Sequence, residues 1–337
     1  MGEGMMGQVA LTVLLATRNG ERVLARTLDG YRRLEAPPVR WKMVLVDNGS
    51  VDSTPEIVKS FKQHLPLELL TSLSPGKNRA LNAGLEAVEG RLLIITDDDA
   101  IPDPTFLGAW AKLLSTREEY GLFGGSIQPL FEVPPPPWML RSRLLLAMMF
   151  GERCLREGPI GPVEIFGANM AMRTSVLARG LRFDENLGPN GLDPLYRAAG
   201  ETEFCLRVAR AGTKCWFARE PVVRHIVRPE QFTRKAWANR AYRLGRARAY
   251  LKHRDQDVGA PARSTHFSDR FSEMRRRAHE IFLNLQMFSP IPEKRYRRSC
   301  VYNLARGFGD ECAKLAQASR GNTVAANTST SKSEGAR

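Results

Sequence analysis

The chain has 337 residues, and its 50 lysines and arginines outnumber its 36 aspartates and glutamates, which gives a formal net charge of +14. This length allows one large core, or a core domain with an extension. The five cysteines are scattered and form no Cys-x-x-Cys pair, which argues against a disulfide framework and against a zinc site. We therefore expect a protein of the reducing cytosol.

Two apolar stretches resemble membrane segments only superficially. No Lys or Arg precedes residues 9–16, and the polar turn Thr17-Arg18-Asn19 follows them at once, so they make a poor signal peptide. Residues 144–150 are far shorter than the roughly 20 residues that span a bilayer. The sequence predicts neither a signal peptide nor a membrane span.

The excess of basic residues lies mainly after Arg224, in runs such as residues 275–277 and 295–298. Composition alone does not separate nucleic acid from anionic lipid or a charged nucleotide substrate. The sequence contains neither the aromatic consensus of RNA-recognition strands nor paired Cys/His zinc spacing. We therefore do not expect nucleic acid as a partner.

The first hundred residues alternate between strand-like and helix-like patterns. Short apolar runs predict strands, and segments with apolar residues at helical spacing separate them. This alternation predicts crossover units, and hence an α/β fold with a Rossmann-like, mostly parallel sheet flanked by helices. The expected strands are 9–16, 43–46, 67–70 and 92–96, and the expected helices begin near residues 23, 54 and 77.

Polar turns follow three of these strands, at residues 17–19, 47–50 and 97–99. In open sheets of this kind, ligands bind outside the carboxyl ends of the strands. If the strand alternation continues, Asp97 and Asp99 project to one side and Asp98 to the other. Paired carboxylates suit hard Mg²⁺ or Mn²⁺; the alternative is a solvated acidic turn. Because no glycine-rich phosphate motif is present, we expect a nucleotide held through a metal.

Four stretches together resemble the nucleotide-sugar-binding half of a GT-A glycosyltransferase of the large inverting family 2. They are residues 16–19, 46–54, 77–84 and 96–99. The resemblance implies a GT-A fold, donor contacts near the turns and a divalent metal, Mn²⁺ or Mg²⁺, on the Asp97-x-Asp99 pair. The residues implied to bind the donor are Thr17, Asn19, Asp47, Arg79, Asp97 and Asp98, with Asp99 on the metal. The alternatives are that Asp47 caps a turn and that Arg79 is a solvated helix residue.

The chain from residue 121 to 194 supplies the expected acceptor side. We expect a strand at 121–128, a rigid joint at the four prolines 134–137 and one buried helix at 138–154, with a flap or a lipid-facing patch as alternatives. The strand 164–173 resembles the family's acceptor-side strand, which implies that Asn169 faces the acceptor. Residues 188–194 are rich in Gly, Pro and Asn and predict a mobile loop.

Residues 200–212 predict a short helix with two faces. Helical spacing puts Glu201 with Phe204 on the inward face, and Glu203 with Arg207 on the outward one, as a surface i,i+4 pair. The helix dipole favours an ionised carboxylate at Glu201. The resemblance places the catalytic carboxylate here as well, so Glu201 is the expected general base. Glu203 is the alternative base and is otherwise assigned to the acceptor side.

Residues 216–218 predict a late edge strand, and His225 follows it. In the family a histidine at this point can complete the metal site; a satisfied structural histidine is the alternative. The region 231–318 is helical and basic, with aromatics among its arginines. Such a surface can stack on bases, pack as a helix face or meet anionic lipid.

The predicted organisation has four parts. Residues 1–7 form a flexible N-terminus, and 8–230 form a GT-A domain with a donor half (8–128) and an acceptor and catalytic half (129–230). A basic helical extension covers 231–318, and 319–337 is expected to be disordered, because it has few apolar residues.

The expected function is an inverting hexosyltransferase. It would move a sugar from a nucleotide-diphosphate sugar to a hydroxyl acceptor that is a glycan, lipid-linked or a small molecule. The expected location is cytoplasmic, with peripheral contact to an anionic inner membrane face left open. A sugar-phosphate nucleotidyltransferase and a catalytically inactive nucleotide-binding or membrane-associating scaffold are the alternatives.

Overall fold

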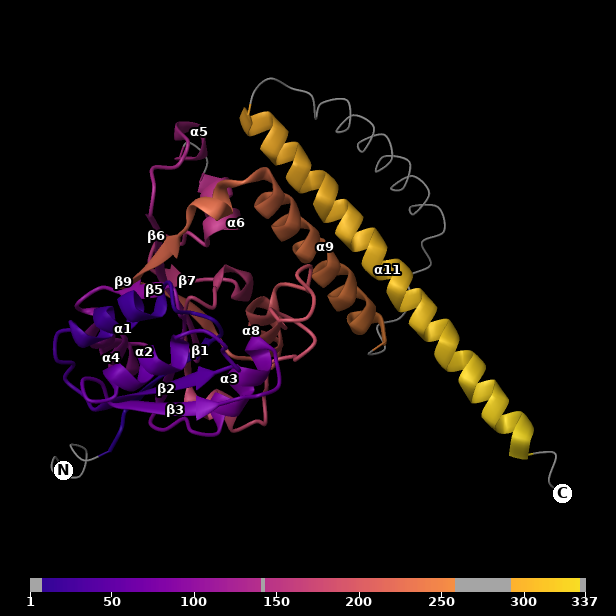
Figure 1. Ribbon diagram of the computed structural model, residues 1–337. Coiled ribbons are helices and arrows are strands. Elements are labelled where there is room, and N and C mark those ends of the chain that lie inside the picture. The colour runs from indigo at the N-terminus through magenta and orange to yellow at the C-terminus, as the bar shows by residue number, and fades with distance from the viewer. Residues whose placement is uncertain (1–7, 141–142, 258–291, 334–337) are drawn as a thin grey trace. The chain divides into compact units, whose positions relative to one another are not determined.

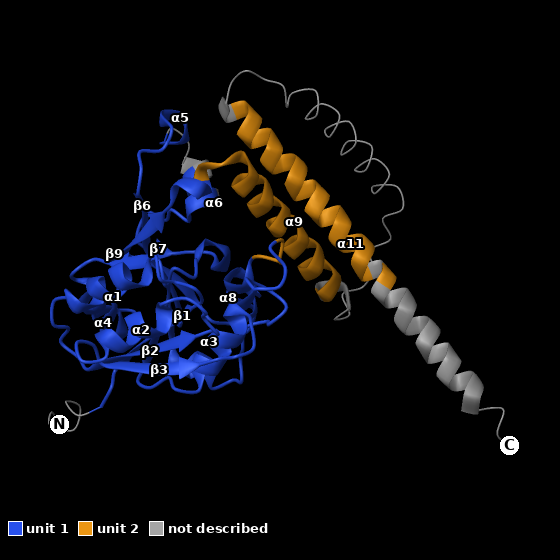
Figure 2. Cartoon of the chain, viewed as in Figure 1, with its two compact units in different colours: residues 1–194, 199–231 blue, residues 195–198, 232–337 orange. Residues whose placement is uncertain are grey.

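The computed structural model describes residues 8–140, 143–257 and 292–333. The expected flexible N-terminus and the basic run at 275–277 lie outside these ranges. The chain divides into two compact units, residues 1–194 with 199–231, and residues 195–198 with 232–337 (Figure 2). Each unit is described by itself below.

The described part of unit 1 is built on a nine-stranded sheet (Figure 1). Its strand order is β3-β2-β1-β4-β8-β6-β9-β5, and β7 pairs with β9. The first four strands in this order are parallel, which confirms the expected α/β class. The strands are β1 (Leu11–Thr17), β2 (Trp41–Asp47), β3 (Leu67–Thr71), β4 (Leu92–Asp97), β5 (Ala100–Pro102), β6 (Leu122–Phe131), β7 (Gly158–Pro159), β8 (Asn169–Arg173) and β9 (Cys215–Val227).

The register of the parallel strands brings the polar turns together. Thr17 at the end of β1 is paired with Asp47 at the end of β2, and Ala16 is paired with Asp97 at the end of β4. The three strands therefore end level with one another, at the same edge of the sheet. The buried, unbroken apolar runs in β1 and β4 are typical of parallel strands that are covered on both faces.

Helices cover the sheet, and two apolar cores lie on its two faces. Leu28, Phe106 and Trp110 belong to one core, and Leu81 and Phe204 belong to the other. The helices of unit 1 are α1 (Leu24–Arg32), α2 (Thr54–Phe61), α3 (Lys77–Leu85), α4 (Phe106–Thr116), α5 (Pro137–Leu140), α6 (Arg143–Phe150), α7 (Thr174–Leu177) and α8 (Gly200–Arg210). Helices α3 and α8 thus share a core, although more than a hundred residues separate them in sequence.

Two expected elements of unit 1 differ in the structure. The late strand is not at an edge, because β9 is 13 residues long and pairs with β6 on one side and with β5 and β7 on the other. The single helix expected at 138–154 ends earlier, at Phe150; its described parts are α5 and α6, and residues 141–142 between them lie outside the described ranges. Pro137 can start α5 because the first turn needs no N–H donor, and Gly151, with a positive φ of 73°, follows the end of α6.

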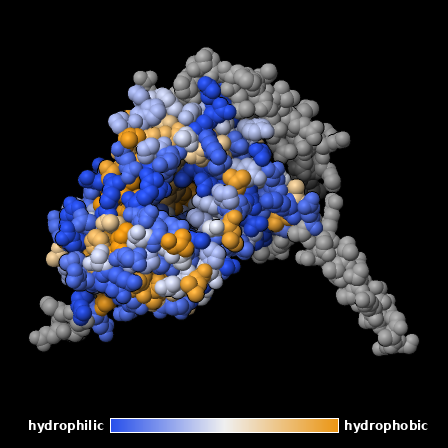
Figure 3. All heavy atoms as spheres, in the orientation of Figure 1, coloured by the Kyte–Doolittle hydropathy of each residue, from blue (hydrophilic) through white to orange (hydrophobic). Residues whose placement is uncertain are grey.

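On the face shown in Figure 3, apolar side chains form separate patches among hydrophilic ones. Val51, Leu73 and Leu192 are the most exposed large apolar residues of the described chain.

Within residues 8–140, 143–257 and 292–333, no helix has both the length and the apolar content needed to cross a bilayer.

The described residues of unit 2 include two long helices, α9 (Arg234–Asp257) and α11 (Pro292–Ser333). A side chain at Gly245 would collide with the carbonyl oxygen of Leu304, and one at Gly307 with that of Tyr242. The two backbones therefore approach each other closely at these glycines. Glu311, fully buried, binds Arg197 at 2.6 Å and Arg246 at 2.7 Å.

The end of α11 differs from the sequence-based expectation. We expected disorder from residue 319, but the backbone is helical as far as Ser333. A helix that has already nucleated gains one hydrogen bond for each added residue without a new nucleation cost. Low apolar content alone therefore does not end this helix.

Candidate active site

Three adjacent carboxylates at the end of β4 have three different partners. The strand ends at Asp97, and Asp98 and Asp99 form a turn before β5, so strand alternation does not continue through them. Asp97 contacts Lys77, and Asp98 accepts a hydrogen bond of 2.6 Å from Thr17 Oγ1. Asp99 lies beside His225. The three acidic side chains are therefore held by residues of α3, β1 and β9.

The crowding of these carboxylates affects their protonation. Burial and the negative charge of Asp99 raise the pKa of Asp98 to about 7, against the opposing effect of its hydrogen bond with Thr17. Burial alone would also raise the pKa of Asp99, but the adjacent His225 outweighs it and lowers that pKa. His225 therefore stabilises the ionised form of Asp99, whereas burial and the neighbouring charge disfavour the ionised form of Asp98.

His225 lies between a carbonyl and a carboxylate. Its Nδ1 is 3.0 Å from the carbonyl oxygen of Phe150, which can only accept, so Nδ1 carries a proton. Its Nε2 lies 3.3 Å from Asp99 Oδ1. Burial alone would lower the pKa of His225, but the negative charge of Asp99 outweighs burial, so the pKa is raised overall. A neutral ring would turn the Nε2 lone pair toward Asp99, so this gap suits a proton or a metal ion.

The donor set at this gap fits a divalent cation that is shared with substrate. Asp99 supplies carboxylate oxygen and His225 supplies an imidazole nitrogen oriented by its carbonyl partner, as metal-binding histidines usually are. Mg²⁺ and Mn²⁺ sites in nucleotide-binding enzymes commonly use few protein ligands and fill the rest with water and phosphate oxygens. In the described part of the chain, no group of three or more His, Cys, Asp or Glu side chains is arranged around one metal position. The two residues would thus form an incomplete site.

Lys77 connects two acidic side chains that come from different elements, Asp97 and Glu201. Its Nζ lies 2.7 Å from Asp97 Oδ1 and 2.7 Å from Glu201 Oε1. Burial lowers the pKa of Lys77, but the charges of Asp97 and Glu201 outweigh it and raise that pKa well above its ordinary value. Lys77 therefore stays an ammonium ion, and the residue expected as the base lies directly beside the donor side.

Glu201 is fixed by its helix as well as by Lys77. It lies in the first turn of α8, after Ala199, whose φ of 65° gives the abrupt entry into the helix. The helix N-terminus stabilises an ionised carboxylate there. On the other side, a Cβ at Gly167 would lie 2.5 Å from Glu201 Oε1. A larger residue at position 167 would therefore displace the Glu201 side chain from this conformation.

Glu203 differs in part from its predicted position. The i,i+4 pair exists, with Arg207 Nε 2.5 Å from Glu203 Oε1, but Glu203 is only 1% exposed. The segment before α8 covers this part of the helix: Arg207 also donates to the carbonyl of Arg182, and Phe183 stacks on Phe204. Spacing within α8 alone could not reveal that cover.

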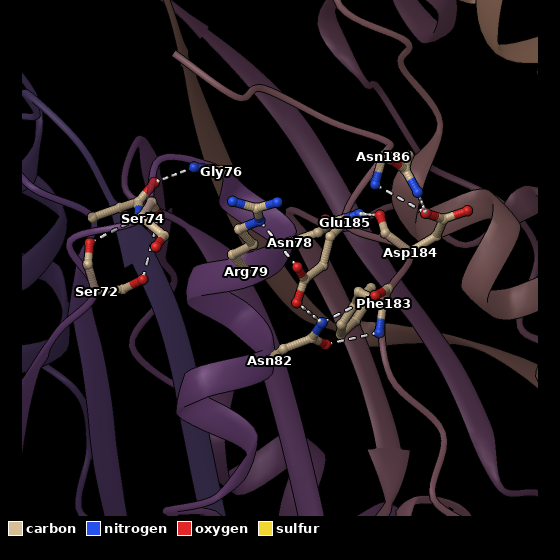
Figure 4. Close-up of polar contacts among 11 residues, drawn as sticks. Ser72, Ser74, Gly76, Asn78, Arg79, Asn82, Phe183, Asp184, Glu185 and Asn186 are labelled. Carbon is tan, nitrogen blue, oxygen red and sulfur yellow. Dashed lines mark hydrogen bonds and ion pairs between the residues drawn. The ribbon is translucent and has the colours of Figure 1, made fainter. Parts of the chain in front are cut away.

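A network of asparagines holds the start of α3. The side chain of Asn48 donates to the carbonyls of Ser72 and Ser74 and accepts a hydrogen bond of 2.7 Å from Gly76 N–H. On the other side of α3, Asn78 donates to the carbonyl of Asp184 at 2.7 Å, and Asn82 exchanges two hydrogen bonds with the backbone of Phe183 (Figure 4). These contacts fix the backbone from which Lys77 projects.

The remaining predicted donor residues lie around the same edge. Asp47 is buried and accepts a hydrogen bond from Ser50 N–H at 3.0 Å, as a turn cap does. Asn19 accepts from Val51 N–H at 2.9 Å. Arg79 is half exposed and pairs with Glu185 at 3.0 Å (Figure 4), so in this structure it points to a carboxylate on the chain itself.

Two further expectations change with the geometry. Asn169 is fully buried, and its amide donates to the carbonyls of Ser126 and Pro221. It therefore joins β8 to β6 and β9 within the sheet. The loop 188–194 is tied to α3, because Lys77 N–H donates to the carbonyl of Pro189 at 2.8 Å.

Sequence reasoning missed Asn48, Lys77, Asn78 and Asn82 as functional or supporting residues. All four stand inside the stretches that carried the resemblance. Their position in those stretches was an available signal. The partners of Lys77, Asn78 and Asn82 at residues 183–201, however, are too distant in sequence to be recognised from spacing.

Comparison with known protein families decides the family. The family model described as "Glycosyl transferase family 2" matches residues 12–181, just over half of the chain. The chain belongs to glycosyl transferase family 2. The matched residues include β1 to β4, the acidic turn and Lys77, and end before α8 begins.

Several family 2 relatives are similar over part of their length. The poly(ribitol-phosphate) beta-N-acetylglucosaminyltransferase TarS of Staphylococcus aureus is 26% identical over 148 residues, which cover 41% of this chain and 26% of TarS. The probable glycosyltransferase YdaM of Bacillus subtilis is 25% identical over 258 residues, which cover 74% of this chain and 57% of YdaM. The chain thus spans about a quarter of TarS and somewhat more than half of YdaM.

Solved structures share the fold. The mannosyltransferase PcManGT of Pyrobaculum calidifontis, solved with GDP-Man and Mn²⁺, superimposes with a TM-score of 0.56 at 19% identity, over 91% of this chain and 87% of that one. TarS residues 1–349 with UDP give a TM-score of 0.51 at 14% identity, over 92% of each chain. The GT-A fold of this family 2 member is therefore confirmed.

Proposed function

We propose that this family 2 member transfers a sugar from a nucleotide-diphosphate donor to an acceptor hydroxyl, with inversion at the anomeric carbon. The observation that carries the proposal is the shared contact of Lys77 with Asp97 and Glu201. It puts a donor-side carboxylate and an ionised carboxylate at a helix N-terminus next to each other. A hexose is the sugar class that we propose for the donor.

Glu201 is the proposed general base. Its carboxylate takes the proton from the acceptor hydroxyl while the hydroxyl oxygen forms a bond to the anomeric carbon. The bond from that carbon to the diphosphate oxygen breaks with its electron pair, and a nucleoside diphosphate leaves. General-base assistance contributes roughly 10²- to 10⁴-fold to such a step. One displacement inverts the anomeric centre.

Asp99 and His225 are the proposed ligands of a divalent metal, Mn²⁺ or Mg²⁺. When bound, such a cation supplies charge neutralisation to the donor diphosphate. The geometry of the Asp99 and His225 pair supports this assignment, and PcManGT, which shares the fold, was solved with GDP-Man and Mn²⁺.

The donor side is proposed to consist of the turns that follow β1, β2 and β4. Support comes from their common edge of the sheet and from fold neighbours solved with UDP, UDP-GlcNAc and GDP-Man. Arg79 joins this set if it exchanges Glu185 for donor phosphate or base. Asn169 and Glu203, both buried, are proposed to contribute to the acceptor side by stabilising β8 and α8. The proposed donor residues are Thr17, Asn19, Asp47, Arg79, Asp97 and Asp98.

The basic helices of unit 2 are proposed to contact anionic lipid at a membrane surface, where the protein would act in the cytoplasm as a peripheral enzyme. Exposed basic residues on both helices support this, because each basic group near such a surface contributes about 1 kcal/mol. They include Arg234, Lys235, Arg248, Lys252, Lys294, Arg295 and Arg306.

The function is tested by incubating the protein with a panel of UDP- and GDP-sugars, Mn²⁺ and candidate hydroxyl acceptors. We expect release of nucleoside diphosphate that depends on acceptor, and a product whose anomeric proton coupling shows inversion. Glu201→Gln should remove this release, whereas Glu220→Gln, which alters a surface pair with Lys112, should not. Release of inorganic diphosphate from a nucleoside triphosphate and a sugar phosphate would instead identify a nucleotidyltransferase.

A further inference from the structure

Lys77 occupies an unusual position, since it is the first residue of α3 and its side chain ends between two carboxylates from different elements. Asp97 comes from the end of β4 and Glu201 from the first turn of α8. The lysine side chain is 20% exposed, and the two carboxylates are 24% and 23% exposed. Because the three groups are largely withdrawn from water, their interaction is screened less than that of a surface pair.

We propose that Lys77 is a positioning residue for the base Glu201, and that it couples the position of this base to Asp97 on the donor side. The inference rests on the proposed function. Lys77 binds Oε1 of Glu201, so this contact sets the direction of the other carboxylate oxygen, Oε2, which would receive the acceptor proton. On a second side the carboxylate lies close to Gly167, where an added Cβ would come within 2.5 Å of Oε1.

The backbone of Lys77 is rigid enough for this task. Asn48 accepts a hydrogen bond from Gly76 N–H, and Pro189 accepts one from Lys77 N–H. Two loops therefore fix the peptide units on which the side chain stands. A positioning group must hold a reacting atom closely, because a displacement of about 1 Å can cost roughly 10²-fold in rate.

The chain offers a matched control lysine. Lys42 near the start of β2 is 14% exposed and binds Glu68 at 3.1 Å and Glu89 at 2.5 Å. It therefore has the same arrangement of one ammonium between two carboxylates. It stands at the amino end of β2, whereas the proposed site is at the carboxyl end beyond Asp47. Replacing Lys42 removes a comparable ionic contact without touching the proposed site.

The experiment compares four variants of the full chain: Lys77→Met, Lys42→Met, Glu201→Gln and the double variant Lys77→Met with Glu201→Gln. The measurements are kcat, donor KM, binding of the nucleoside diphosphate by calorimetry, and the thermal midpoint. We expect Lys77→Met to lower kcat about 10- to 100-fold, with a smaller change in nucleoside diphosphate affinity. In the Glu201→Gln background, the same substitution should change kcat less than about twofold, because groups that act as one unit are not additive. Lys42→Met should leave kcat near the wild-type value.

A conservative variant covers the case in which Lys77→Met does not fold. Lys77→Arg keeps the positive charge but changes its geometry, so it should fold, lower kcat by less than Lys77→Met would, and again have little effect when Glu201 is Gln.

The inference is overturned if the two single-variant losses in kcat multiply in the double variant, since Lys77 would then act independently of Glu201. A rise in donor KM with unchanged kcat would also overturn it and make Lys77 a simple binding residue. If Glu201→Gln by itself leaves transfer intact, the proposed base is wrong. That result can be told apart from a failure of the Lys77 inference alone, because in that case Glu201→Gln still slows transfer.

Discussion

His225 Nε2 and Asp99 Oδ1 lie 3.3 Å apart, while the other ring nitrogen of His225 faces the carbonyl of Phe150. The carbonyl fixes the tautomer, so the ring presents Nε2 to the carboxylate. The two side chains come from β9 and from the turn after β4, and the pairing of Ala100 with His225 in the sheet holds them together. A cation bound here would meet ligands whose directions are already set.

Asp99→Ala should abolish Mn²⁺-dependent binding of a nucleoside diphosphate, because it removes the carboxylate oxygen of the proposed metal pair. Calorimetric titration with Mn²⁺ and with EDTA checks this. Asp29→Ala is the control, since Asp29 is a carboxylate that pairs with Arg32 and Arg33 at the end of α1; it should leave binding unchanged. Equal nucleotide affinity with and without EDTA in the wild-type protein would refute the metal assignment.

Glu201→Gln and Glu203→Gln should separate catalysis from stability. Glu201→Gln should lower kcat roughly 10²- to 10⁴-fold, with donor affinity near normal. Glu203→Gln weakens a buried bond to a charged partner, so it should cost about 1–3 kcal/mol of unfolding free energy, with kcat largely retained. Steady-state kinetics and thermal unfolding measure both. The reverse pattern would make Glu203 the base.

Gly245→Ala and Gly307→Ala should each destabilise the pair of helices α9 and α11, because the added methyl group meets backbone of the other helix. Such overpacking typically costs about 1–3 kcal/mol. Gly309→Ala is the control in the same helix: no neighbouring atom lies within 4 Å of its added Cβ, and alanine favours a helix over glycine by up to about 1 kcal/mol. Thermal unfolding followed by circular dichroism should show opposite shifts, and equal shifts would contradict the packing.

Acid should weaken the contribution of Glu311 to the stability of unit 2. Burial would raise the pKa of this carboxyl, but its hydrogen bonds with Arg246 and Arg197 outweigh burial and lower the pKa below the usual 4.5. A lowered folded-state pKa gives stability that is fully present above the unfolded value and lost as pH falls through the folded value. Glu311→Gln lacks this dependence. The difference in thermal midpoint between wild type and Glu311→Gln should therefore shrink below pH 4.5, and a constant difference would argue against the linkage.

The basic helices should bring the protein to anionic but not to neutral liposomes. Co-sedimentation should weaken with added salt, because exposed charges are screened over about 10 Å at 0.1 M ionic strength. Equal binding to both kinds of liposome would remove the electrostatic explanation. Preferential capture of single-stranded RNA at physiological salt would assign the basic surface to nucleic acid.

The parts of the fold that depend on local pattern were predictable from sequence. The buried runs of β1 and β4 and the turn at Asp97 follow from hydrophobic period and from where it stops. The burial of Glu203 and Asn169 was not predictable, because covering segments from elsewhere in the chain cause it. The same holds for Lys77, whose two partners lie 20 and 124 residues away. Motif position pointed to these residues, but only the three-dimensional contacts give their roles.

The reciprocal hydrogen bonds between Asn82 and Phe183 join residues that are 101 positions apart. During synthesis, α3 is therefore made about a hundred residues before the segment that binds it. Strand β4 is likewise made before β8, its antiparallel neighbour. Contacts of such long sequence separation slow folding, because loop-closure entropy must be overcome before they form. A fragment of residues 8–128 would therefore lack Phe183 and β8, which complete the contacts of α3 and β4.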